Sequence, residues 1–392
     1  MSVIDKRLGF GLLALTTLAA ASPADDFVAT PVEAERLELM SRPEAWFVAN
    51  LEGPREVVDG QHLDPKLQYH FEARRRRPPE LVEKGLAMFH SAEQRPIARA
   101  ALARDWAVLT KVTAPMRKVE DGAIDGRGGK IPIRIYTPAA DEPGPLPMLL
   151  YFHGGGWIYS GIEATDRSAR LIANEARAIV VSVEYRLAPG HKWPAANDDG
   201  EDAFLWARAN AAALGSDPAM IGVGGDSAGG NISLAISRRQ LAGGKPAPLY
   251  QLLYYTSTDF EPRYRSFALF GKGYGLDIAF RDFMIPLAFG DAATAARAAE
   301  ELQAGDMKGM PATIVVTAGF DILRDPAQEL ARQLERDGVA VTYLNYPTLA
   351  HGFLQFSGVV EDADRAATDS ARLFGTAIRS RAPLVGNGAA LR

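Results

Sequence analysis

Short, almost continuously apolar runs divide the chain from about residue 116 onward. Strands buried on both faces of a parallel sheet show such runs, because helices cover both faces. Residues 116–138 instead alternate apolar and polar positions around glycine-rich turns, which predicts two antiparallel strands opening the sheet. The pattern predicts an α/β fold with a mostly parallel central sheet flanked by helices. Six apolar runs, separated by stretches of helical composition, are its predicted strands: 147–152, 178–185, 220–225, 249–255, 312–319 and 339–347.

Two segments differ from this pattern in their residue composition. Residues 25–115 are rich in Ala, Glu, Arg and Leu and carry no strand signal, so we expect several short helices there. Residues 256–310 contain an aromatic, glycine-rich passage and then an Ala-rich helical one, which indicates an insertion over the sheet. We therefore expect an N-terminal helical segment at 25–115, an α/β domain formed by 116–255 and 311–385, and a second helical segment at 256–310.

The first 24 residues have the layout of a secretory signal peptide. Lys6 and Arg7 precede an apolar stretch of about 13 residues, 8–20, and small residues follow it. The stretch is too short for a membrane-spanning helix of about 20 residues, and no later stretch reaches that length without charges. We expect export to a periplasm or the medium and no integral membrane span. The alternative is an amphipathic N-terminal helix packed on the body of a cytoplasmic protein.

Composition narrows the chemistry further. The net charge is −5 and the charges are spread along the chain, which argues against nucleic acid as a partner. With no cysteine, the chain has no disulfide, thiolate nucleophile or cysteine-ligated metal. Its six histidines include no His-Glu-x-x-His pair, and no loop has calcium-binding spacing. We expect neither a metal nor a cofactor.

One predicted strand leads into a candidate nucleophile. The run 220–225 continues as Gly225-Asp226-Ser227-Ala228-Gly229 and then into a helical stretch. This is Gly-x-Ser-x-Gly between a strand and a helix, where the turn is so sharp that only glycine fits on either side of the serine. The pattern predicts that Ser227 stands clear of the sheet. A chance match to this short motif is the alternative.

Two further strand ends carry groups that could activate this serine. A hydroxyl is a weak nucleophile unless a base takes its proton, and the base must be held in one tautomer by a third group. His351 follows the run 339–347, and Asp321 follows the run 312–319. The chain order Ser, Asp, His is the order used on this type of fold. Asp325 is the rival for the acid, and a surface loop is the alternative for His351.

A glycine-rich turn follows the first apolar run, in His153-Gly154-Gly155-Gly156-Trp157. Three glycines let the backbone approach a ligand closely and direct its N–H groups at one point, as stabilisation of a tetrahedral oxyanion requires. The alternatives are a flexible turn or a phosphate cradle. The sequence lacks the Gly-Lys-Ser/Thr that a phosphate cradle of this kind would carry.

Together these motifs resemble the hormone-sensitive-lipase-like branch of the α/β-hydrolases, the bacterial family IV carboxylesterases. The resemblance covers about 116–375 and rests on HGGGW, YRLAP with WPAA, GDSAGGN, DILRD and HGF. It implies the α/β-hydrolase fold with a cap built from the two helical segments. The resemblance implies that Ser227 is the nucleophile, His351 its base and Asp321 the acid that orients the base. It also implies that the N–H groups of Gly155, Gly156 and Ala228 form the oxyanion hole and that His153 braces the glycine-rich loop.

The resemblance also implies an activity. It points to a serine carboxylesterase that hydrolyses short-acyl or small aryl and alkyl esters without a cofactor, its partner being a small-molecule ester. An amide deacetylase, a lipase and a non-catalytic small-molecule receptor stay open, and so does a homodimer. The sequence departs from the family pattern at Gly190, usually Glu, and at Trp193, usually Phe. The usual Asp-Pro…Ser-Pro-Leu segment is not recognisable at 290–303.

Overall fold

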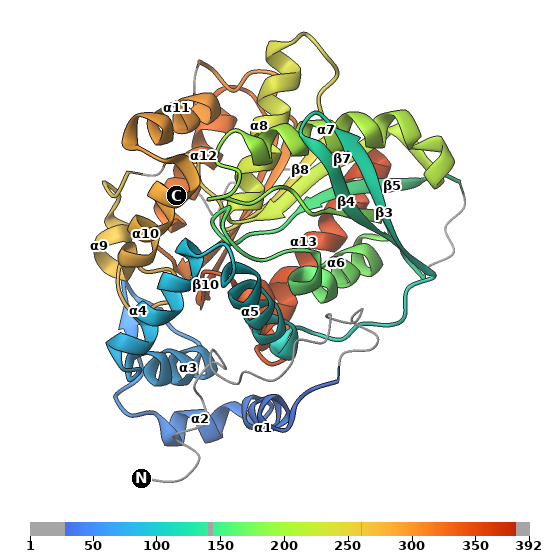
Figure 1. Cartoon of the computed structure of the whole chain (residues 1–392). Coiled ribbons are helices and arrows are strands. Elements are labelled where there is room, and N and C mark those ends of the chain that lie inside the picture. The colour runs from blue at the N-terminus through green and yellow to red at the C-terminus, as the bar shows by residue number, and fades with distance from the viewer. Residues whose placement is uncertain (1–27, 140–143, 260, 304, 382–392) are drawn as a thin grey trace.

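A computed structural model describes residues 28–139, 144–259, 261–303 and 305–381. Its central element is an eight-stranded sheet in the order β10-β9-β8-β7-β5-β6-β4-β3 (Figure 1). β4 pairs antiparallel with β3 and β6, and every other pair is parallel. The strands are β3 (Lys118–Gly126), β4 (Gly129–Thr137), β5 (Leu146–Phe152), β6 (Ile179–Val183), β7 (Ser216–Asp226), β8 (Tyr250–Tyr254), β9 (Ala312–Phe320) and β10 (Val341–Ala350). The predicted α/β class is confirmed.

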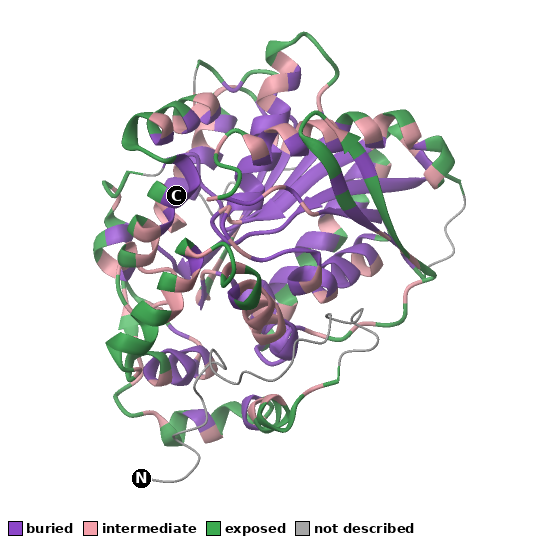
Figure 2. Cartoon of the chain, in the orientation of Figure 1, coloured by how far each residue is buried: buried purple, intermediate pink, exposed green. Residues whose placement is uncertain are grey.

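Helices cover both faces of the central strands, which explains why β5, β6 and β8 are buried along their whole length. Leu149 and Tyr151 of β5 pack in one buried cluster with Phe374 of α13. The alternate residues Leu150 and Phe152 pack in a second cluster on the opposite face. Figure 2 shows the resulting buried sheet between partly exposed helices. The first face carries α6 (Ile162–Ala176) and α13 (Glu361–Ser380), and the second carries α7 (Ala195–Asn210), α8 (Ala228–Ala242) and α12 (Arg324–Arg336).

The segment before the sheet is mainly helical, but our expectation of helices alone was wrong. Its elements are α1 (Pro31–Met40), α2 (Glu44–Asn50), β1 (Val57–Val58), β2 (Gln61–His62), α3 (Pro65–Arg75), α4 (Pro79–Ala87), the short 3₁₀-helix η3 (Met88–His90) and α5 (Arg95–Leu109). β1 and β2 form an antiparallel hairpin around Asp59 and Gly60, both with positive φ. Asp-Gly is a strong signal for such a two-residue turn. The predicted signal peptide at 1–24 lies outside the described residues.

The second helical segment lies over the same end of the sheet as the first. It contains α9 (Arg265–Phe270), α10 (Ile278–Phe289) and α11 (Ala292–Gln303). Met284 and Phe289 of α10 share an apolar cluster with Phe89 and Ala98 of the N-terminal segment. Ile158, in the loop after β5, belongs to the same cluster. We call this two-segment layer the cap. Among the described residues, no helix is both long and apolar enough to cross a membrane.

Phe374 offers a test of this layering. Its side chain is fully buried against the backbone of Gly222 in β7. Phe374→Ala should therefore lower the free energy of unfolding by about 3–5 kcal/mol, measured by urea denaturation. Leu205→Ala, at a 39 % exposed position of α7, is the matched control and should change it by less than about 1 kcal/mol. Equal effects of the two substitutions would contradict the packing described here.

Candidate active site

Ser227 occupies the turn between β7 and α8. Its φ of 53° and ψ of −118° are strained for a residue with a side chain. A Cβ on Gly225 or on Gly229 would overlap the carbonyl oxygen of Phe152, so both positions require glycine. The turn is held by Ser227 N–H, which donates to the Tyr254 carbonyl at 2.9 Å. Backbone packing, rather than side-chain preference, thus fixes the serine at the carboxyl end of the sheet.

The structure brings Ser227, His351 and Asp321 into one hydrogen-bonded row. His351 follows β10 and places Nε2 3.0 Å from Ser227 Oγ. Its Nδ1 lies 2.8 Å from Asp321 Oδ2, at the end of β9. A carboxylate only accepts, so Nδ1 carries the proton and Nε2 is free to accept the serine proton. Asp321 is almost fully buried and His351 is 13 % exposed at its side chain, so a substrate can reach the base but not the acid.

The rival acid, Asp325, has a different role. Its Oδ2 accepts from Ser266 N–H of α9 at 2.8 Å, and its Oδ1 accepts from Arg324 Nε at 2.7 Å. Ser266 Oγ also donates to the carbonyl of Ile322 at 2.6 Å. Asp325 therefore fastens the cap to the loop that carries Asp321.

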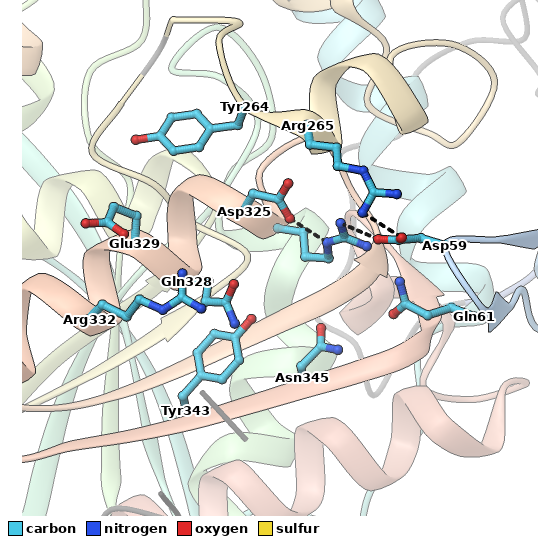
Figure 3. Close-up of a pocket in the computed structure, with 11 residues that line it drawn as sticks. Asp59, Gln61, Tyr264, Arg265, Asp325, Gln328, Glu329, Arg332, Tyr343 and Asn345 are labelled. Atoms are coloured by element: carbon cyan, nitrogen blue, oxygen red, sulfur yellow. Dashed lines mark hydrogen bonds and ion pairs between the residues drawn. The ribbon is translucent and has the colours of Figure 1, made fainter. Parts of the chain in front are cut away.

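A polar pocket of about 560 Å³ lies behind that loop (Figure 3). The Arg324 guanidinium bridges Asp325 and Asp59, the latter at 3.1 Å, and Asp59 also binds Arg265 at 2.7 Å. These ion pairs join the β1–β2 hairpin, α9 and the start of α12. Ser227, His351 and Asp321 do not line this pocket. The ion pairs that line the pocket therefore help to hold the loop that carries Asp321.

Two peptide planes after β5 are oriented as an oxyanion hole requires. His153 Nδ1 lies 2.7 Å from the carbonyl oxygen of Gly154. The N–H groups of Ile158 and Tyr159 donate to the carbonyl of Gly155 at 3.1 and 3.2 Å. In a trans peptide the C=O and the next N–H point in opposite directions. The N–H groups of Gly155 and Gly156 therefore point out of the loop.

The third candidate donor belongs to the helix that follows the nucleophile. Ala228 is the first residue of α8, where a backbone N–H has no partner within the helix. The helix N-terminus also carries partial positive charge, which favours a developing anion beside Ser227. The three predicted donors thus come from the two chain segments that meet at the turn.

Buried polar groups hold this loop in place. Asp226 Oδ1 accepts from Gly154 N–H at 2.8 Å and from the Tyr151 hydroxyl at 2.7 Å. The Tyr185 hydroxyl donates to the His153 carbonyl at 2.7 Å, and its ring stacks on the His153 ring at 4.2 Å. Burial raises the pKa of Asp226. Burial also lowers the pKa of His153 to about 4, so its imidazole is neutral at pH 7 and braces the loop through Nδ1–H.

Asp226 and Tyr185 also belong to the site, but no sequence pattern predicts this. Asp226 precedes Ser227 directly and Tyr185 opens the YRLAP motif, so each lies within a motif that carries the family resemblance. Their function depends on contacts with the loop after β5, which the sequence alone does not reveal.

The cap also reaches the loop after β5 that contains Gly155 and Gly156, which we call the oxyanion loop. A Cβ on Gly156 would overlap Sδ of Met284 in α10. Tyr159, three residues further on, contacts the rings of Trp106 in α5 and Phe280 in α10 at centroid distances of 5.7 and 6.0 Å. The cap thus places apolar side chains beside the loop, and an apolar environment strengthens hydrogen bonds to a developing charge.

The positions that depart from the family pattern lie in different surroundings. A Cβ on Gly190 would make an ordinary contact with the carbonyl oxygen of Leu187 at 3.6 Å. Trp193 packs against the apolar cluster shared with α10, and its backbone N–H donates to the Ala288 carbonyl at 3.0 Å. Most of 290–303 is the helix α11. In the described part of the chain, no group of three or more His, Asp or Glu side chains could hold a metal ion.

In this mostly parallel sheet, a serine lies at a strained strand-to-helix turn after β7, an acid follows β9 and a histidine follows β10. This combination defines an α/β-hydrolase. Comparison with known proteins agrees. The family model described as alpha/beta hydrolase fold matches residues 149–355. The chain belongs to the hormone-sensitive-lipase-like branch of this family.

Three relatives illustrate the similarity. The carboxylic ester hydrolase LipN of Mycobacterium tuberculosis is 36 % identical over 312 residues, covering 77 % of this chain and 80 % of LipN. An ethyl acetate hydrolase of Pseudomonas putida is 32 % identical over 248 residues, covering 60 % and 76 %. A solved ester hydrolase from the metagenome of Lake Arreo is 32 % identical with a TM-score of 0.70, covering 78 % of this chain and 94 % of that protein.

The neutral state of His153 predicts a pH dependence of stability. The ordinary pKa of histidine is 6.5, and the pKa in the fold is about 4. Between these values the unfolded chain binds the additional proton. The contribution of neutral His153 to the free energy of unfolding is therefore complete above about pH 6.5 and is lost as the pH falls toward 4. From pH 7.5 to 5.0 the wild type should lose about 2 kcal/mol more unfolding free energy than His153→Asn.

Urea denaturation of both proteins at the two pH values measures this difference. Burial raises the pKa of Asp64 and of Asp105 to about 6, but both proteins contain these groups, so their contributions cancel in the comparison. Equal losses in the wild type and the variant would show that His153 is not held neutral.

Proposed function

We propose that this protein is a serine carboxylesterase that hydrolyses short-acyl or small aryl and alkyl esters through an acyl-enzyme. The observation that carries the proposal is the row of contacts from Ser227 Oγ to His351 Nε2 at 3.0 Å and from His351 Nδ1 to Asp321 Oδ2 at 2.8 Å. The ester hydrolases among its relatives support the reaction class.

In the first half of the proposed reaction, Ser227 Oγ attacks the ester carbonyl carbon while His351 Nε2 takes the hydroxyl proton. Asp321 stabilises the imidazolium that forms. The N–H groups of Gly155, Gly156 and Ala228 hold the negative charge on the former carbonyl oxygen. The intermediate collapses by breaking the bond to the alcohol oxygen, and His351 returns its proton to that oxygen. The acyl group then remains on Ser227.

The second half repeats these steps with water. His351 Nε2 takes a proton from the water, whose oxygen attacks the acyl carbon, and the same N–H groups hold the second oxyanion. Breaking the bond to Ser227 Oγ releases the acid, and His351 protonates the serine. These protein groups carry out each proton transfer and each charge stabilisation of the cycle.

Two observations support small substrates. The oxyanion loop is covered by bulky side chains of the cap, namely Met284 against Gly156 and the rings of Trp106 and Phe280 against Tyr159. The name of the Pseudomonas putida relative, ethyl acetate hydrolase, also describes a small ester. The intact hydrogen-bonded row argues against a receptor that does not catalyse.

A panel of p-nitrophenyl esters from acetate to palmitate tests the proposal. The wild type should cleave the acetate and butyrate fastest. Ser227→Ala should lower kcat by at least about 10⁴-fold while retaining the fold. Ser380→Ala, at the end of α13, is the matched control and should keep full activity. Full activity in Ser227→Ala would overturn the proposal.

The other outcomes separate the alternatives. Preference for palmitate together with activation at a lipid surface would indicate a lipase. Cleavage of the p-nitroanilides in place of the esters would indicate an amide deacetylase. A folded wild type that cleaves none of these substrates but binds small molecules would indicate a receptor.

Export and self-association complete the proposal. Lys6, Arg7 and the apolar stretch 8–20 support export by a cleaved signal peptide. The sheet ends in the edge strands β3 and β10, which could pair with a second copy in a homodimer. N-terminal sequencing of periplasmic protein should find the chain starting near Asp25, and an intact Met1 terminus would contradict export with cleavage.

Light scattering of the purified protein should give the mass of a dimer. A monomeric mass would contradict the homodimer.

A further inference from the structure

We propose that Arg99, in the cap helix α5, is a positioning residue for the oxyanion hole, so that the cap takes part in catalysis and does not only enclose the substrate. This inference rests on the proposed esterase function. It concerns a residue outside the motifs that carry the family resemblance and distant in sequence from the catalytic row.

Arg99 joins two loops of the α/β domain. Its Nε donates to the carbonyl of Ile158 at 3.0 Å, and its Nη2 donates to the carbonyl of Ala188 at 3.0 Å. The two loops also meet directly, because Ala188 N–H donates to the carbonyl of Trp157 at 2.9 Å. The planar guanidinium has parallel donors in a fixed fork, which suits two neighbouring carbonyl groups. Its charge strengthens both hydrogen bonds.

The carbonyl that Arg99 holds belongs to the turn that orients the oxyanion donors. Ile158 N–H, on the same residue, donates to the carbonyl of Gly155 and thereby fixes the peptide plane from which Gly156 N–H projects. A rotation of Ile158 would therefore change the direction of that donor. Arg99 holds the residue from one side while Gly155 holds it from the other.

This loop needs such support because its backbone is strained. Trp157 and Ser160 have φ values of 61° and 76°, which are uncommon for residues with side chains. Strained conformations of this kind persist only where the surroundings hold them. The contacts of Arg99 supply part of that restraint from the cap.

The neighbouring arginines of α5 serve other contacts. Arg95 Nη1 donates to the carbonyl of Phe89 at 3.3 Å, within the N-terminal segment. Arg104 pairs with Glu33 of α1 at 2.6 Å. Arg95 is therefore a suitable control for the charge and length of an arginine on this helix.

The inference predicts an effect on kcat. If Arg99 orients the oxyanion donors, its loss weakens an interaction that is stronger in the transition state than with bound substrate. Arg99→Ala should lower kcat for p-nitrophenyl butyrate by about 10- to 100-fold, with KM within about threefold of the wild type. A residue that only shapes the pocket would instead raise KM and leave kcat unchanged.

Two variants make the test specific. Arg99→Lys keeps the charge but has no fork, so its kcat should lie between those of the wild type and Arg99→Ala. Arg95→Ala should retain the wild-type kcat. Guanidinium chloride at tens of millimolar should restore part of the activity of Arg99→Ala and none to Arg95→Ala. Unfolding curves show that each variant is folded, and if Arg99→Ala does not fold, Arg99→Lys carries the comparison.

Inactivation by diethyl p-nitrophenyl phosphate gives a second readout. Its attack by Ser227 also develops negative charge on an oxygen, so Arg99→Ala should slow inactivation by a factor similar to the fall in kcat. Wild-type values of both kcat and inactivation rate in the folded Arg99 variants would overturn the inference and leave the esterase proposal standing. A wild type that reacts with neither the ester nor the phosphate would overturn both.

Discussion

The carbonyl oxygen of Phe152 would overlap a Cβ on Gly225 or on Gly229, and the organisation of the site depends on this close approach. Phe152 is the last residue of β5, and the two glycines flank Ser227. Because the backbones are this close, the chain leaving β5 must pass directly beside the nucleophile. The strained turn and the glycine loop are therefore two results of one packing constraint.

Buried polar contacts complete the same arrangement. Asp226, beside the nucleophile, accepts from Gly154 N–H and so links the turn to the loop. Neutral His153 then fixes the next peptide plane. A buried group without such partners would cost free energy, so this network favours one conformation of the loop. The N–H groups predicted to form the oxyanion hole are thus held in place by the fold itself, as preorganised stabilisation of an oxyanion requires.

The sequence was most informative where function and fold depend on short segments. The apolar runs predicted the parallel strands because burial on both faces excludes polar residues, and Ser227, Asp321 and His351 followed from their positions after such runs. The β1–β2 hairpin was missed although Asp59-Gly60 signals a turn. Contacts such as Arg99 to Ile158 or Met284 to Gly156 join residues distant in the chain, and periodicity carries no information about such pairs.

We propose above all that Ser227 is the activated nucleophile of this fold. The most direct measurement is mass spectrometry of the protein after treatment with diethyl p-nitrophenyl phosphate, with esterase activity followed in parallel. We expect one diethylphosphoryl group per chain, attached to the peptide that contains Ser227, and loss of activity in proportion to labelling. Labelling of another residue in step with the loss of activity, or esterase activity that survives complete labelling of Ser227, would contradict it.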